Sequence, residues 1–273
     1  MTGGSADNSD FIADDLPPVT IDRFLGGRFE VEQPEKGRHR SGMDAILLAA
    51  AIPQDAKGKL VDLGAGAGVA GMAAACRIPD LSVLLVERDP VMLSLSRRSL
   101  NRPGNAHIQA RVSILPADIT AKGSQRHAAG LTSAIAEHVI LNPPYYDNHA
   151  VSQSPAEKKA DAHVLGTSGI EPWIRTAADI LTGSGTMTVI YRADGLADLL
   201  AVMSNRFGAI TMVPVFPREG QAATRIIIQA KRNSRAPTKI RRGVVMHQSS
   251  GSTYTEEVEA ILRDGQALDI AAL

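Results

Sequence analysis

The four residues Asn142-Pro143-Pro144-Tyr145, near the middle of the chain, combine types that could hold an amino group for chemistry. They follow the largely apolar stretch 137–141 and so stand at the end of a predicted strand. Two prolines fix the backbone and remove two N–H donors, which leaves the local carbonyl oxygens free to accept hydrogen bonds. The side-chain oxygen of Asn142 and the carbonyl of Pro143 could then accept both hydrogens of a planar amino group, and Tyr145 could stack on its ring.

An amino group on an adenine ring is a poor nucleophile, because its lone pair is delocalised into the ring. Acceptors that bind both of its hydrogens favour a pyramidal nitrogen whose lone pair points at an incoming methyl group. No strong general base is required, since the proton becomes acidic once the methyl group is attached. The sequence thus predicts Asn142, Pro143 and Tyr145 as catalytic residues for methylation of a planar amine. The alternative is that they form only a rigid turn at the end of a strand.

Three glycines, Gly64, Gly66 and Gly68, follow a predicted strand at 59–65 and open a predicted helix at 69–78. Because glycine has no Cβ atom, the backbone there can turn tightly and approach a ligand closely. The stretch also matches the G-x-G-x-x-G pattern of nicotinamide dinucleotide sites, which is a weak signal by itself. The glycines therefore predict a nucleotide cofactor without deciding which one.

Carboxylates at the ends of successive strands favour S-adenosylmethionine over a dinucleotide. Asp62 lies in the strand just before the glycines, where it suits the ammonium group of that cofactor, although it could instead cap the following helix. Glu87 stands 21 residues after Gly66 and could accept the ribose hydroxyls. Asp118 could accept from the adenine amino group, or could be a solvated loop acid. The predicted cofactor-binding residues around these positions are Asp62, Gly64, Ala65, Gly66, Gly68, Glu87, Arg88, Asp118, Ile119 and Asn142.

Strand and helix patterns alternate along the chain, which predicts an α/β fold with a doubly wound, mostly parallel sheet. An antiparallel pair at one edge closes the predicted sheet. The predicted strands are 28–33, 59–65, 82–89, 108–118, 137–146 and 185–192, with a terminal hairpin at 209–216 and 224–231. The predicted helices are 43–52, 69–78, 90–102, 171–182, 196–207 and 255–265.

We expect one methyltransferase domain at 21–265 after a disordered acidic tail at 1–20. Within it, 21–55 precedes the glycine loop, 56–232 is the expected Rossmann-like core, and 233–265 is a basic segment with a terminal helix. No internal repeat interrupts this organisation.

The overall charge is balanced, with 29 Lys and Arg against 29 Asp and Glu. Four of the acids lie in residues 1–20, so the remainder carries 29 basic and 25 acidic residues, a weak excess of +4. Six basic residues occupy the twelve positions 231–242, which could contact nucleic-acid phosphates or could be solvated surface. The predicted nucleic-acid contacts are Arg38, Lys231, Arg232, Lys239, Arg241 and Arg242.

The one cysteine, Cys76, excludes an intrachain disulfide and reads as a small core residue of a helix. No apolar run approaches the roughly 20 residues of a membrane-spanning helix, and the acidic N-terminus lacks the character of a signal peptide. No metal-ligand spacing is present. These features predict a cytoplasmic protein with no metal and no membrane partner.

The chain resembles the class I methyltransferases of the small-domain type, and most closely the bacterial tRNA (adenine-N6) methyltransferases that act in the anticodon loop of a valine tRNA. The resemblance covers about residues 21–265. It implies a seven-stranded sheet whose last strand is antiparallel, S-adenosylmethionine as cofactor and an RNA substrate, which we expect to be tRNA. It also implies that 21–55 forms an N-terminal cap and cofactor lid, in which the segment around Asp44, with Arg40, lies over the cofactor. The matching stretches are RHRSGMDAILLA (38–49), VDLGAGAGVAG (61–71), VERDP (86–90), ILNPPYY (140–146), KKADAH (158–163), PREGQAATRIIIQAKR (217–232) and YTEEVEAILRDG (254–265).

Other functions use some of the same features. The same corner serves methylation of glutamine side-chain amides in a release factor or ribosomal protein, although such enzymes usually carry a separate N-terminal domain, and about 55 residues precede the glycines here. A DNA adenine methyltransferase would usually carry a target-recognition insertion. A nicotinamide oxidoreductase would need hydride-transfer residues that the sequence does not supply. A non-catalytic binding module fits poorly with an intact Asn142-Pro143-Pro144-Tyr145 corner beside the glycines.

Overall fold

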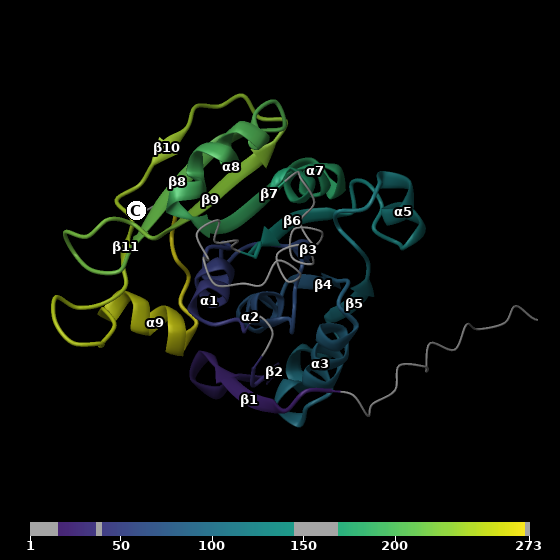
Figure 1. The fold of residues 1–273 in the computed structure, drawn as a ribbon, viewed down its shortest axis with the longest axis horizontal. Coiled ribbons are helices and arrows are strands. Elements are labelled where there is room, and N and C mark those ends of the chain that lie inside the picture. Colours follow the sequence, from purple (N-terminus) through teal and green to yellow (C-terminus); the bar gives the residue numbers. More distant parts are fainter. Residues whose placement is uncertain (1–15, 37–39, 145–168, 271–273) are drawn as a thin grey trace, which may run out of the picture.

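The computed structural model describes residues 16–36, 40–144 and 169–270. One large sheet runs through these residues, and helices cover both of its faces (Figure 1). Its strand order is β10-β8-β9-β7-β6-β3-β4-β5, with β11 also paired to β8. The strands are β3 (Gly58–Leu63), β4 (Leu81–Glu87), β5 (Val112–Pro116), β6 (Ala136–Leu141), β7 (Leu181–Arg192), β8 (Phe207–Phe216), β9 (Arg225–Arg232), β10 (Lys239–Ile240) and β11 (Val244–Val245).

The predicted doubly wound sheet is confirmed. Strands β3 to β7 pair with one another in parallel, and β9 runs antiparallel between β7 and β8. Two short strands, β10 and β11, extend the sheet beyond the seven predicted, because the basic segment after β9 returns along the outer edge of β8. The sequence did not predict these two strands, because strands of two residues are too short to show an alternation of apolar and polar residues.

Two apolar clusters form the core, one on each face of the sheet. One face is covered by α1 (Met43–Ala50), α2 (Val69–Arg77), α3 (Pro90–Leu100) and α9 (Glu256–Asp264). The other face is covered by α7 (Glu171–Ile180) and α8 (Leu196–Met203). The short helices α4 (Ala106–Gln109) and α5 (Gly123–Ala128) complete the connections around β5. Within the described ranges, no helix is long and apolar enough to cross a membrane.

Three helices of one face end on the side chain of Arg77, which is 4% exposed. Its guanidinium group donates to the carbonyls of Ala49 at 2.6 Å and Gly265 at 2.9 Å, which lie at the ends of α1 and α9. Burial lowers the pKa of Arg77 to about 10. The partial negative charge at the C-termini of the helices stabilises the positive charge of the Arg77 guanidinium. This contact fixes α1 against α2, and so fixes the segment that leads into α1.

An antiparallel hairpin precedes α1 and packs outside the main sheet (Figure 1). It consists of β1 (Val19–Phe24) and β2 (Phe29–Pro34). Only the second strand was predicted, and β1 begins at Val19, inside the range expected to be an acidic tail. Two charged residues, Asp22 and Arg23, interrupt the alternation of apolar and polar residues in β1, and they pair with Arg40 and with Glu30 of β2. The sequence of β1 alone therefore resembles a polar segment.

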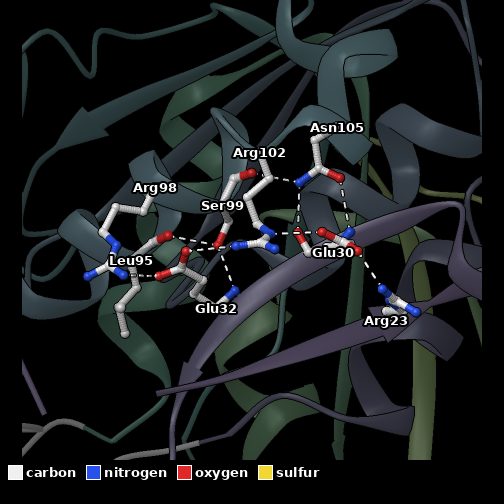
Figure 2. A network of polar contacts seen from close by, with 8 residues as sticks. All are labelled: Arg23, Glu30, Glu32, Leu95, Arg98, Ser99, Arg102 and Asn105. Carbon is white, nitrogen blue, oxygen red and sulfur yellow. Dashed lines mark hydrogen bonds and ion pairs between the residues drawn. The ribbon is translucent and has the colours of Figure 1, made fainter. Parts of the chain in front are cut away.

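A network of ion pairs holds this hairpin on α3 (Figure 2). The carboxylate of Glu32, on β2, lies 2.7 Å from the guanidinium of Arg98 and 3.1 Å from that of Arg102. Arg102 also donates to Glu30 at 2.8 Å, and the backbone N–H of Glu32 donates to the Ser99 hydroxyl at 2.8 Å. Since the side chain of Glu32 is 7% exposed, these cationic partners offset the cost of burying its carboxylate. The hairpin is therefore attached to the same helix that follows β4.

Candidate functional site

The carboxyl ends of the four central parallel strands meet at one edge of the sheet. Leu63 of β3 pairs with Leu141 of β6, so Gly64 and Asn142 are the next residues of neighbouring strands. On the other side of β3, Glu87 at the end of β4 pairs with Pro116 of β5. The glycine loop, the predicted reacting corner and two of the predicted acids thus leave the sheet at the same edge, as the sequence predicted.

The glycine loop adopts a conformation that requires glycine. Gly64, Gly66 and Gly68 have φ of +70°, +57° and +91°. The N–H groups of Gly64 and Ala65 both donate to the carbonyl of Val86, at 2.8 and 3.0 Å, which ties the loop to the end of β4. A Cβ atom on Gly64 would in addition lie 2.4 Å from the ring of Trp173. Positive φ and close packing together exclude side chains here.

Glu87 is held rigidly by the backbone around it. Its Oε2 accepts the N–H of Gly66 at 2.8 Å, and its Oε1 accepts the N–H groups of Arg88 and Asp89 at 2.7 and 2.9 Å. A carboxylate offers about four acceptor positions, so three are used and Oε2 keeps the remaining one. That position is available to a ribose hydroxyl, and the binding of both hydroxyls by Glu87 stays a prediction.

Asp118 occupies the end of β5, beside Glu87. Its Oδ1 accepts the backbone N–H and the hydroxyl of Thr120 at 2.8 and 2.7 Å, and its Oδ2 lies 3.1 Å from the guanidinium of Arg88. Partial burial alone would raise the pKa of Asp118, but the hydrogen bonds of Thr120 and the charge of Arg88 outweigh it and lower that pKa. Asp118 is therefore an ionised acceptor, and Arg88 joins it to the end of β4.

Asp62 is buried beneath the glycine loop, with 3% of its surface exposed. Its Oδ2 accepts the N–H of Gly71 in the first turn of α2 at 2.9 Å. Burial raises the pKa of Asp62 to about 7; the Gly71 N–H opposes this rise and the charge of Glu87 adds to it. Asp62 thus makes the contact expected of a residue that caps the following helix. Its role toward the cofactor stays a prediction.

The predicted reacting corner is described as far as Pro144. Asn142 is half-buried and Pro143 is buried, directly beyond β6. Tyr145 lies outside the described residues. The corner therefore brings Asn142 and Pro143 to the strand end that adjoins the glycine loop.

Two residues of the expected cofactor lid have partners within the fold. Arg40 donates to the Thr20 hydroxyl at 2.9 Å, to the Pro34 carbonyl at 2.8 Å and to the Asp22 carboxylate at 2.7 Å. These contacts attach Arg40 to the β1–β2 hairpin, and none of its contacts in the described ranges reaches the loops after β3, β4 or β5. Asp44, in the first turn of α1, accepts from Arg225 at the start of β9 at 2.9 Å. A role for either residue toward the cofactor stays a prediction.

Helix α7 contributes residues to this edge that sequence reasoning missed. Trp173 packs against Gly64. Thr176 donates to the carbonyl of Ile119 at 2.7 Å, in the loop after Asp118. Two predicted cofactor-binding residues, Ile119 and Ala65, are buried in the loops after β5 and β3, with 5% and 8% of their surfaces exposed. Trp173 is the one tryptophan of the chain, and this rarity was the only feature of the sequence that could have drawn attention to it. Its position beside the glycines depends on tertiary contacts, which the sequence does not show.

The predicted nucleic-acid contacts are divided over the outer part of the sheet. Lys231 and Arg232 end β9 at the amino edge of the parallel strands, since Lys231 pairs with Thr186 near the start of β7. Six residues of strand, about 20 Å, separate Lys231 from Arg225 at the carboxyl edge. The other described members of the set, Lys239, Arg241 and Arg242, lie along β10 and toward β11. Arg38 lies outside the described residues.

The donors and acceptors of this edge fit S-adenosylmethionine. Glu87 keeps an acceptor for a ribose hydroxyl, Asp118 is an ionised acceptor at the next strand end, and Asp62 supplies a buried carboxyl group near the glycine loop. Across the described ranges, no group of His, Cys, Asp and Glu is arranged to hold a metal ion. A nucleotide with a cationic amino-acid end matches this set of side chains.

Comparisons with known proteins agree with this fold and site. A family model described as "Methyltransferase small domain" matches residues 40–215. A curated relative from Shewanella amazonensis, named tRNA1(Val) (adenine(37)-N6)-methyltransferase, is 25% identical over 81% of this chain and 89% of its own. A relative from Serratia proteamaculans, named ribosomal RNA large subunit methyltransferase G, is 29% identical over 53% of this chain and 38% of its own.

A solved structure from Agrobacterium tumefaciens, described as a predicted O-methyltransferase, is 36% identical, with a TM-score of 0.70. The alignment covers 82% of this chain and 97% of that one. The fold and the site together define a methyltransferase that uses S-adenosylmethionine. The chain belongs to the methyltransferase small-domain family.

Replacing Glu87 by alanine tests the ribose contact. We expect the affinity for S-adenosylhomocysteine to fall roughly 10- to 150-fold, because one charge-assisted hydrogen bond is lost. Calorimetric titration measures the change. Glu137→Ala is a matched control, since Glu137 also accepts a backbone N–H, that of Lys59 at 2.7 Å, but at the opposite edge of the sheet. Equal affinity of Glu87→Ala and the wild-type protein would contradict the assignment.

The buried carboxyl of Asp62 predicts a pH-dependent stability. Its pKa in the folded protein is about 7 and its ordinary value is 3.8, so the folded state binds the proton more tightly. Stability is therefore lost as pH rises from about 4 to about 7, by at most about 4 kcal/mol. Asp62→Asn removes this titration and retains an acceptor for Gly71. Denaturant unfolding from pH 4 to 8 should show a wild-type stability that falls relative to the variant; parallel profiles would refute the raised pKa.

Proposed function

We propose that this enzyme methylates the exocyclic N6 amino group of an adenine in RNA, within a tRNA anticodon loop. The observation that carries the proposal is the position of Asn142 and Pro143, one residue beyond the Leu63–Leu141 pair and therefore next to the glycine loop. The names of the Shewanella and Serratia relatives, which refer to tRNA and ribosomal RNA, support an RNA substrate. A tRNA substrate would place the enzyme in the cytoplasm.

The residues at this edge can perform the roles that such a reaction needs. The bound cofactor supplies a methyl group on a positively charged sulfur. The Asn142 side-chain oxygen and the Pro143 carbonyl accept the two N6 hydrogens and so hold the nitrogen in the orientation for attack. These groups are fixed before the substrate arrives, because Pro143 is buried and β6 is a central strand. Tyr145 is proposed to stack on the target base.

The target base must leave its stack to reach this edge, which suits a single-stranded loop. We place the RNA backbone along the outer edge of the sheet, on Lys239, Arg241 and Arg242. Lys239 is exposed, and the Nε of Arg241 is buried with no hydrogen-bond partner in the described ranges. Arg242 shares its charge with Glu257 at 3.2 Å. Four strand spacings, about 19 Å, separate β10 from β6, a distance that a hairpin can span.

Asn142→Ala tests the proposed reaction. The variant should bind S-adenosylhomocysteine with nearly unchanged affinity and lose turnover on a tRNA anticodon hairpin by a factor on the order of 10²–10³, as for other fixed hydrogen bonds to a transition state. Transfer of a labelled methyl group measures turnover, and calorimetry measures affinity. Near-normal turnover would show that the amide has no role. Transfer by the wild-type protein to a release factor in place of RNA would favour the glutamine reaction.

Charge removal at β10 tests the proposed RNA surface. Replacing Lys239, Arg241 and Arg242 by glutamine should weaken hairpin binding and flatten the dependence of log affinity on log salt by about 2, taking roughly 0.7 per phosphate contact. Cofactor affinity should not change. Fluorescence anisotropy of a labelled hairpin at several salt concentrations gives the slope.

The matched control removes the same charge far from this edge. Lys57 and Lys59 lie at the amino edge of the sheet beside β3, and Arg97 is exposed on α3. Their triple replacement by glutamine should leave the salt slope within experimental error. An unchanged slope in the β10 variant, or an equal change in the control, would identify the β10 cluster as solvated surface.

A further inference from the structure

Trp173 lies where α7 meets the cofactor edge of the sheet. It stands in the first turn of α7, and its ring fills the space beside Gly64, so that a Cβ atom there would lie 2.4 Å from Cη2 and 2.6 Å from Cζ3. Only 7% of the residue is exposed. The indole is thus a buried wall of the loop that binds the cofactor.

The indole N–H of Trp173 has no acceptor in the described part of the chain. Its Nε1 is among the few buried side-chain nitrogen and oxygen atoms there without a hydrogen-bond partner. Tryptophan N–H groups normally find a partner when they are buried, and folded proteins leave few such groups unsatisfied. An unpaired donor at a binding site indicates that a bound molecule supplies the acceptor.

The contacts of α7 with two loops of this edge favour one candidate for that molecule. One turn after Trp173, the hydroxyl of Thr176 donates to the carbonyl of Ile119 at 2.7 Å. The helix therefore contacts the loop after β3 through Trp173 and the loop after β5 through Thr176. Both loops carry residues assigned to the cofactor, and β10, where the RNA backbone is placed, lies at the other end of the strand order. The position of the indole favours the cofactor over the RNA as its acceptor.

We propose that the Nε1–H of Trp173 donates a hydrogen bond to bound S-adenosylmethionine. The cofactor offers acceptors of two kinds, the carboxylate oxygens of its amino-acid end and the oxygen and nitrogen atoms of its nucleoside end. A neutral donor can pair with either and adds no charge beside the sulfonium. The inference rests on the cofactor of the methyltransferase and does not depend on which substrate is methylated.

Because the chain has one tryptophan, a protein labelled with ¹⁵N-tryptophan gives one indole N–H resonance. Titration with S-adenosylhomocysteine should move its proton resonance downfield, as a hydrogen bond forms, whereas an RNA hairpin alone should leave it in place. A resonance that stays in place while calorimetry shows saturation would overturn the proposal. If calorimetry shows that S-adenosylhomocysteine does not bind, the methyltransferase assignment itself fails, so the two failures are distinguishable.

Trp173→Phe removes the donor and retains an aromatic ring against Gly64. Its affinity for S-adenosylhomocysteine should fall about 2- to 10-fold, the effect of one neutral hydrogen bond. The affinity for methylthioadenosine, which lacks the amino-acid end, identifies the acceptor: an equal loss assigns the nucleoside, and no loss assigns the carboxylate. Unchanged affinity for both ligands would overturn the proposal. The resonance of the wild-type protein answers the same question if the variant does not fold.

Discussion

The hydrogen bond from the Gly66 N–H to the Glu87 carboxylate, at 2.8 Å, joins the two loops on which the cofactor site depends. It exists because β3 and β4 are parallel neighbours, so that the glycine loop and Glu87 leave the sheet side by side. The same parallel pairing places Asn142 beside Gly64 through β6. One constraint, the common direction of the central strands, therefore brings the cofactor groups and the reacting corner to one edge.

The acids of this edge have different environments and so different protonation behaviour. Asp118 is half-exposed and bonded to Thr120 and Arg88, which lower its pKa. Asp62 is buried under the glycine loop with one N–H donor, and its pKa is raised to about 7. Two carboxyl groups in neighbouring parts of one site can therefore serve as a permanent anion and as a group whose charge responds to a nearby cation. A cofactor with an ammonium group would favour the ionised form of Asp62.

The elements of the central sheet were predictable from the sequence, because buried parallel strands are continuous apolar runs and helices such as α7 show apolar residues at helical spacing. The glycine loop and Glu87 were found for the same reason, since they end such runs. The strand β1, the short strands beyond β9 and the place of Trp173 were missed, because each depends on partners distant in sequence. Arg40, predicted from a resemblance to lie over the cofactor, has its described contacts with the hairpin, and its role toward the cofactor stays a prediction.

The position of Asn142 beside the glycine loop suits an adenine N6-methyltransferase that acts on RNA. The most direct measurement is transfer of a labelled methyl group from S-adenosylmethionine to a tRNA anticodon hairpin, followed by digestion to nucleosides and mass spectrometry. We expect the label to appear in N6-methyladenosine. Label in a ribose- or oxygen-methylated nucleoside, the acceptor that the name of the Agrobacterium relative suggests, or no label in RNA, would contradict it.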